Sequence, residues 1–160
     1  MWVLGSALVL GCAGAQAVEP LPQAVRGYND AVRWQRFTAA AAHLDPARRD
    51  DFLDARDQLH EDLRINDFEV IRVRLDRDGV RARVHIKTTW HLDSEGIVRD
   101  THTVQTWHRA GKQWLLIRET HLRGEPMPGV EKPADASPES REDAADIGSD
   151  DGQVPHPGDE

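Results

Sequence analysis

The chain has 160 residues, of which 39% are hydrophobic and 30% charged, and its formal net charge at pH 7 is −8. This length fits a single domain, and a single cysteine excludes a disulfide within the chain. Most of the negative charge lies after residue 123, so the remaining part is nearly neutral and gives no reason to expect a nucleic-acid partner.

A short apolar run at residues 2–11 leads to the only cysteine, Cys12. The run is too short to span a bilayer, which needs about 20 apolar residues, and it predicts an export signal. The four residues Val9 to Cys12 resemble the bacterial lipobox, in which the cysteine is lipidated and becomes the mature N-terminus. We therefore expect residues 1–17 to be an export signal, with a lipid anchor at Cys12 that holds the protein to a membrane of the cell envelope. The small-residue pattern ending at Ala17 supports the alternative of cleavage there, which would release a soluble exported protein.

Three helical segments are predicted next. Apolar residues recur at helical spacing over residues 21–34, and the alanine-rich residues 37–44 favour a second, shorter helix. Asp45 and Pro46 predict the start of a third helix, because aspartate caps helix N-termini and proline suits the first helical position. The inward face of this third helix is expected to carry Phe52, Ala55, Leu59 and Leu63.

After Asn66 the apolar period changes from about 3.6 to 2, which indicates β-strands. Strands are expected over residues 68–75, 80–92, 97–109 and 114–122, separated by glycine-containing turns. Helices followed by a four-stranded antiparallel meander give an α+β fold in which the helices cover one face of the sheet. The first hairpin also carries a basic strip, which is expected to be solvated, with contact to an anionic surface as the alternative; it comprises Arg72, Arg74, Arg81 and Arg83.

Two segments resemble the NTF2-like superfamily, which includes ketosteroid-isomerase-like and polyketide-cyclase-like domains. Residues 26–31 look like the opening helix of that family, and residues 111–117 look like its last strand, in which Trp114 follows a glycine-containing turn. The resemblance covers residues 20–123 and implies helices packed in a curved sheet around a cone-shaped pocket. The family often has a histidine six residues after this tryptophan, where this chain has Thr120. A cystatin-like helix-plus-sheet arrangement is the alternative.

The resemblance implies candidate site residues. Isomerases of that superfamily use a pocket carboxylate as a base and a tyrosine or an acid as an oxyanion donor. Tyr28 on the first helix is the candidate donor, and Asp100 and Glu119 are the candidate bases, although no carboxylate is marked as catalytic by the sequence itself. The large aromatic residues are expected in the core or around an apolar ligand pocket; they are Tyr28, Trp34, Trp90, Trp107 and Trp114.

Histidines on the strands offer a weaker candidate, a metal site. If the last turn closes as expected, His102 comes opposite His121, with Asp100 and Glu119 on the same side of the sheet. Zinc accepts such ligands. The spacing of these histidines matches no compact zinc motif. A one-residue change of register would also move the candidate ligands of one strand to the other face of the sheet. No metal and no other cofactor is therefore expected.

Residues 124–160 are acidic, rich in proline and free of aromatic residues, so we expect a disordered tail. The leading functional prediction is a lipid-anchored envelope protein whose non-catalytic domain binds a protein partner or a small apolar ligand. The alternatives are a pocket enzyme of the isomerase or cyclase type and a metal-binding module.

Overall fold

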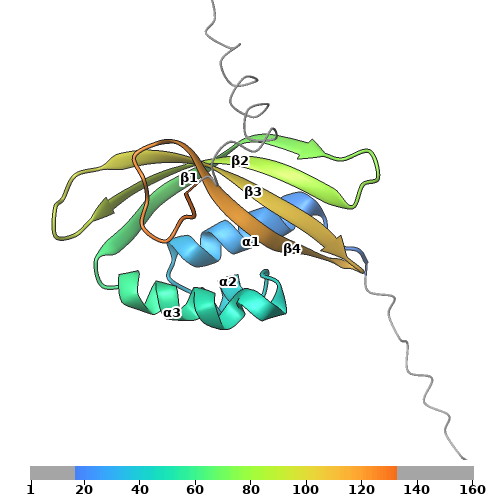
Figure 1. Ribbon diagram of the computed structural model, residues 1–160, viewed down its shortest axis with the longest axis horizontal. Coiled ribbons are helices and arrows are strands. Elements are labelled where there is room, and N and C mark those ends of the chain that lie inside the picture. Colours follow the sequence, from blue (N-terminus) through green and yellow to red (C-terminus); the bar gives the residue numbers. More distant parts are fainter. Residues whose placement is uncertain (1–16, 133–160) are drawn as a thin grey trace, which may run out of the picture.

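The computed structural model describes residues 17–132 (Figure 1). The predicted signal and Cys12 anchor, and the acidic residues from 133 onward, lie outside the described residues. The elements, in chain order, are α1 (Leu21–Arg33), α2 (Phe37–Ala41), the 3-10 turn η1 (Pro46–Arg48), α3 (Arg49–Leu59), β1 (Leu63–Leu75), β2 (Arg81–Leu92), β3 (Arg99–Ala110) and β4 (Gln113–Gly124).

The strands form one antiparallel sheet in the order β1-β2-β3-β4, and the helices lie together on one face of it (Figure 1). The predicted α+β class, with helices before a four-stranded meander, is confirmed. We call the face toward the helices the inner face and the opposite one the outer face. Among residues 17–132, every helix is too short or too polar to cross a membrane.

The local sequence explains where the third helical segment begins and ends. The Asp45 side chain accepts a hydrogen bond from the Ala47 amide at 2.9 Å, as expected of a cap, and the chain then makes η1 before α3. The helix ends at Leu59, four residues earlier than the apolar spacing predicts. Leu63 is instead the first residue of β1, where it is buried with Trp90 of β2.

The main core lies between α1 and the inner face of β2, β3 and β4. Helix α1 buries a continuous stripe that includes Val25 and Tyr28, and Trp107 of β3 is fully buried against it. The ring planes of Tyr28 and Trp107 meet at 82°, with their centroids 6.0 Å apart. Trp34 corrects one prediction, because it follows the last turn of α1 and is 64% exposed, with the Arg33 guanidinium over its ring.

Residues after β4 belong to the folded domain, contrary to a tail that starts at residue 124. Met127 is buried against Leu63 and Trp90. The His121 amide donates to the Glu131 carbonyl at 2.8 Å, so the chain after β4 loops back and lies beside that strand at residue 131. On the same side of β4, the Leu116 amide donates to the His43 carbonyl at 2.7 Å. The folded domain therefore extends at least to residue 132.

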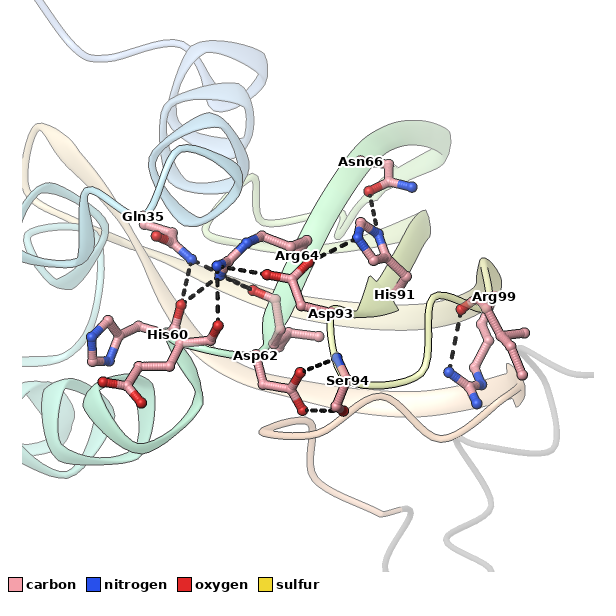
Figure 2. A network of polar contacts seen from close by, with 12 residues as sticks. Gln35, His60, Asp62, Arg64, Asn66, His91, Asp93, Ser94 and Arg99 are labelled. Carbon is pink, nitrogen blue, oxygen red and sulfur yellow. Dashed lines mark hydrogen bonds and ion pairs between the residues drawn. The ribbon is translucent and has the colours of Figure 1, made fainter.

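A polar network ties the start of β1 to the turn between β2 and β3 (Figure 2). The Asp62 carboxylate accepts hydrogen bonds from the Ser94 amide at 2.7 Å and from its hydroxyl at 2.8 Å. These bonds hold the pKa of Asp62 below its usual value. Nearby, Asp93 forms an ion pair with Arg64 at 2.7 Å, and its Oδ1 lies 3.2 Å from Nε2 of His91. The network fixes this end of the β1–β2 pair.

Candidate functional site

A hollow of about 180 Å³ lies between α3 and β4. It is the strongest candidate site because apolar walls surround a group of charged and polar side chains. Leu44, Phe52, Ala55 and Leu116 provide the apolar lining. Tyr28, Arg56 and Glu119 provide polar groups, and Arg48, Asp51 and Glu131 complete the charged part of the lining.

The Glu119 carboxylate is the best-held polar group in this pocket. Glu119 stands opposite Gln105 in the β3–β4 register, so it shares the inner face of the sheet. One carboxylate oxygen, Oε1, accepts hydrogen bonds from the Thr103 hydroxyl and the Gln105 amide, both at 3.0 Å. The other oxygen, Oε2, is approached by the Tyr28 hydroxyl at 3.4 Å, a long contact. Glu119 is therefore fixed in orientation while Oε2 retains capacity to accept further hydrogen bonds.

Behind the carboxylate, a chain of buried amides links the sheet to α1. The Gln105 amide donates to the Asn29 side-chain oxygen at 3.0 Å, and its own oxygen accepts from Asn29 and from the Trp107 indole, each at 3.3 Å. Gln105 is fully buried and Asn29 nearly so. Because such polar groups are costly to bury without partners, this connected set holds α1, β3 and β4 in one arrangement.

Tyr28 stays a neutral hydroxyl in this setting. Burial, followed by the negative charge of Glu119, raises the pKa of Tyr28 well above its ordinary value, and the nearby Arg56 guanidinium opposes the shift. The side chain is 3% exposed, and its ring packs against Phe52 with centroids 6.3 Å apart. The hydroxyl can therefore act as a hydrogen-bond donor in the pocket across the physiological pH range.

Arg56, Thr103 and Gln105 are site residues that we did not predict from the sequence. Arg56 is 4% exposed, with its guanidinium 5.3 Å from the centre of the Phe52 ring. Its position four residues after Phe52 puts both on one face of α3, a signal present in the sequence. Thr103, Gln105 and Trp107 are two residues apart along β3, so all three side chains lie on the inner face of the sheet.

The two candidate bases lie on opposite faces of the sheet. Glu119 comes together with Tyr28, as the enzyme hypothesis requires. Asp100 lies on the outer face, where its carboxylate accepts a hydrogen bond from Thr89 at 2.6 Å and pairs with Lys87 at 3.0 Å. These two partners lower the pKa of Asp100 and keep it ionised. Asp100 is therefore no part of the pocket.

The three strand tryptophans expected around a ligand pocket are core residues. Trp90, Trp107 and Trp114 are 3%, 0% and 5% exposed, and none of them lines the hollow between α3 and β4. Trp90 donates its indole hydrogen to the Thr101 hydroxyl at 2.7 Å, within a smaller cluster that includes Met127. Of the aromatic residues predicted for the pocket, only Tyr28 is placed there.

The structure does not bring His102 and His121 together. Two extra residues in β4, Ile117 and Leu122, shift the register, so that His121 stands opposite Thr103 and His102 opposite Arg123. His102 therefore lies on the outer face, where its Nδ1 is 2.9 Å from Nε2 of His85, and His121 lies on the inner one. Within residues 17–132, no group of three histidine, cysteine or acidic side chains is placed to hold a metal ion.

A second hollow, of about 500 Å³, lies between α1 and β1. Its apolar lining includes Val25, Phe68 and Val73. At this hollow Arg33 forms an ion pair with Asp67 at 2.9 Å, so two of its charged groups satisfy each other. It lacks the buried, fixed carboxylate that distinguishes the first pocket.

Comparison with known proteins shows likeness of fold only. No protein-family model and no curated protein matches the sequence. The chain is similar to the solution structure of RPA3114, a SEC-C motif containing protein from Rhodopseudomonas palustris, with a TM-score of 0.55 and 19% identity over 72% of this chain and 84% of that one. It is also similar to the intermembrane space region of the chloroplast protein ARC6, with a TM-score of 0.47 and 16% identity over 61% of this chain and 90% of that one.

The likeness to the SEC-C motif containing protein overturns the resemblance to the NTF2-like superfamily. That protein is not an NTF2-like domain, and the cone-shaped pocket of the NTF2-like family is not confirmed. The physical reason is that the matching segments were generic. An amphipathic first helix suits any fold in which helices cover an antiparallel meander, a tryptophan after a glycine-containing turn is not specific to one family, and the family's histidine is replaced by Thr120. The fold is instead like that of the SEC-C motif containing protein.

Proposed function

We propose that this domain is a non-catalytic binding module whose α3–β4 pocket takes a small ligand with an apolar body and one hydroxyl or amino group. The observation that carries this proposal is the Glu119 carboxylate. Two donors fix its Oε1 at 3.0 Å, while its Oε2 has only the long 3.4 Å contact with Tyr28 among the described residues. A ligand hydroxyl or ammonium group would donate to Oε2, a charge-assisted bond in the second case.

The size of the pocket supports a ligand of about one ring. An apolar cavity of about 150 Å³ is sufficient for benzene, and this hollow measures about 180 Å³. Phe52 and Leu116 offer apolar surface to the ring. The ring would gain free energy from burial at these walls, and its polar group would select the orientation that faces Glu119.

Three probes of similar size test the proposal: toluene, benzyl alcohol and benzylamine, with binding followed by NMR titration of the full chain. Benzyl alcohol and benzylamine are expected to bind more tightly than toluene and to shift signals of residues on α3 and β4. Glu119→Gln should remove most of the preference for benzylamine. The matched control is Glu69→Gln, because Glu69 is exposed on β1 outside this pocket. Equal binding of all three probes, or an equal loss in the control, would contradict the proposal.

The pocket-enzyme alternative is favoured by one observation, the approach of the Tyr28 hydroxyl to Glu119. An isomerase would use the carboxylate to move a proton next to a carbonyl and the hydroxyl to stabilise the enolate oxygen. A small β,γ-unsaturated cyclic ketone distinguishes the two functions. The binding module leaves it unchanged, whereas an isomerase converts it to the conjugated ketone and loses this activity in Glu119→Gln.

We further propose that the domain is held at a membrane of the cell envelope through a lipid on Cys12. The support is the lipobox-like order of residues 9–12 in the sequence. Intact-mass analysis of the mature protein from a bacterial host tests it. A diacyl or triacyl mass increment on a chain beginning at Cys12 is expected. A chain beginning at Val18 would show release as a soluble exported protein instead.

A further inference from the structure

The outer face of the sheet is strongly basic. The pairing register aligns three rows of four residues across the strands, which are Arg74–Arg83–Thr106–Arg118, Arg72–His85–Val104–Thr120 and Glu69–Lys87–His102–Arg123. Six of these positions are arginine or lysine, two are histidine, and Glu69 is the one acid among them. Asp100, next to these rows on the same face, pairs with Lys87 at 3.0 Å. We call the six cationic residues the basic face; they are Arg72, Arg74, Arg83, Lys87, Arg118 and Arg123.

The charges on this face are placed against one another. Arg74 and Arg83 stand directly opposite in the β1–β2 pair, and like charges at such positions weaken strand pairing. The pKa of His102 is lowered by burial and by the nearby charges of Arg123 and Lys87, as expected where positive charge is concentrated. Positive charge is therefore concentrated on this face, which favours contact with an anionic segment.

The same chain carries a segment of matching charge. Residues 133–160 contain nine acidic residues against Arg141, and they follow directly on Lys132. At residue 131 the chain runs beside β4, where Glu131 pairs with Arg48 at 2.6 Å and lies 3.9 Å from Arg118 of the basic face. The acidic segment therefore begins at the margin of the basic face.

The segment is also long enough to cover the face. Twenty-eight residues reach up to about 90 Å when extended, whereas four strands at their normal spacing are only about 15 Å from first to last. A tethered segment reaches an effective concentration in the millimolar range. It therefore competes well with anions from outside the chain.

We propose that residues 133–160 dock on the basic face of their own domain and cover it by charge complementarity. The contact depends on opposite charge and not on apolar burial, so salt weakens it. An external anionic partner reaches the face only by displacing this segment. The proposal is independent of the α3–β4 pocket, which opens on the other side of the sheet.

Zero-length crosslinking of the full chain tests the docking. A carbodiimide joins a carboxylate to a lysine amine in direct contact, and the chain has three lysines, Lys87, Lys112 and Lys132. Lys87 is on the basic face, whereas Lys112 lies in the β3–β4 turn and serves as an internal control. A mixture of isotope-labelled and unlabelled protein separates links within one chain from links between chains.

We expect several-fold more links from acidic residues of 133–160 to Lys87 than to Lys112. These links should fall several-fold in about 0.5 M salt, where charges are screened over a few ångströms. They should also fall in Arg72→Gln/Arg83→Gln and persist in the control Arg26→Gln/Arg36→Gln, whose arginines are exposed on the helical side. The proposal would be overturned if links to Lys87 are no more frequent than links to Lys112. It would also be overturned if the frequency of links to Lys87 is unchanged by salt and by Arg72→Gln/Arg83→Gln.

The same variants identify a different occupant. Phosphatidylglycerol vesicles are mixed with the full chain at physiological salt, and the sedimented protein is measured. A covered face predicts that Arg72→Gln/Arg83→Gln sediments as the unchanged protein does. Binding that depends on these arginines would overturn the proposal, because it would show that the basic face is open to a membrane.

Discussion

Gln105→Met tests whether the buried amide chain holds the pocket in place. Methionine has a similar volume, so the change removes hydrogen bonds while leaving little cavity. The lost bond to the Glu119 carboxylate contributes about 1.5–3 kcal/mol. The Trp107 indole N–H, fully buried, loses its partner at a cost of about 1–3 kcal/mol. The total expected loss is about 2.5–6 kcal/mol, a large part of the roughly 5–15 kcal/mol by which domains are stable.

Urea unfolding followed by tryptophan fluorescence and by circular dichroism measures this loss. The control is Gln113→Met, because Gln113 is an exposed residue of β4 and should change stability by less than about 0.5 kcal/mol. At about 4 °C per kcal/mol, the midpoint temperature of Gln105→Met should fall by roughly 10–24 °C. A loss below about 1 kcal/mol, or one equal to that of the control, would refute the reasoning that this network is satisfied and stabilising.

Three further outcomes are expected. Tyr28 is the only tyrosine, and its raised pKa means that the folded state favours the neutral phenol. The neutral phenol therefore contributes fully to the stability of the fold below about pH 10, and this contribution is lost as pH rises above that value. Phenolate absorbance should therefore appear only with unfolding, and its appearance near pH 10 in folded protein would contradict the burial of the hydroxyl. Met127→Ala should lower the free energy of unfolding by about 2–5 kcal/mol, whereas the exposed Pro126→Ala should be near neutral in the same urea experiment. The lowered pKa of His102 means that the folded state favours the neutral imidazole. The contribution of His102 to the free energy of unfolding is therefore complete above about pH 6.5 and decreases as pH falls. We expect the stability of His102→Gln to be less sensitive to acid in that range.

The fold could be predicted because each class of element carries its own period. The change from a helical period to alternation after Asn66, together with the glycine turns, was sufficient for the order and pairing of four strands. Position along an element was harder to predict. Leu63 and Trp34 continue apolar patterns in the sequence, but each lies beyond the last residue of its helix. Tertiary contacts that end a helix are not visible in its own spacing.

Two residues of the candidate site, Tyr28 and Glu119, were predicted, and both predictions came from the resemblance to the NTF2-like superfamily. Tyr28 was chosen for its place on the first helix, and Glu119 as a carboxylate on the last predicted strand. The error with His102 and His121 came from two extra residues in β4; the first, Ile117, moves Glu119 and His121 to the face opposite His102, and the second, Leu122, changes the register again. Gln105 was missed because a buried amide looks like a surface residue until its partner, Asn29 on a distant helix, is known.

The two outer margins of the sheet differ in their availability for strand pairing. Along β4, amides at positions 116 and 121 are already bonded to residues 43 and 131. Along β1, side chains including Ile71, Val73 and Leu75 are 43%, 45% and 56% exposed, and in residues 17–132 no further strand pairs there. The β1 edge is therefore the more available of the two for association between copies. A pairing of β1 with β1 would be antiparallel and symmetric, and it would use the same edge in both molecules.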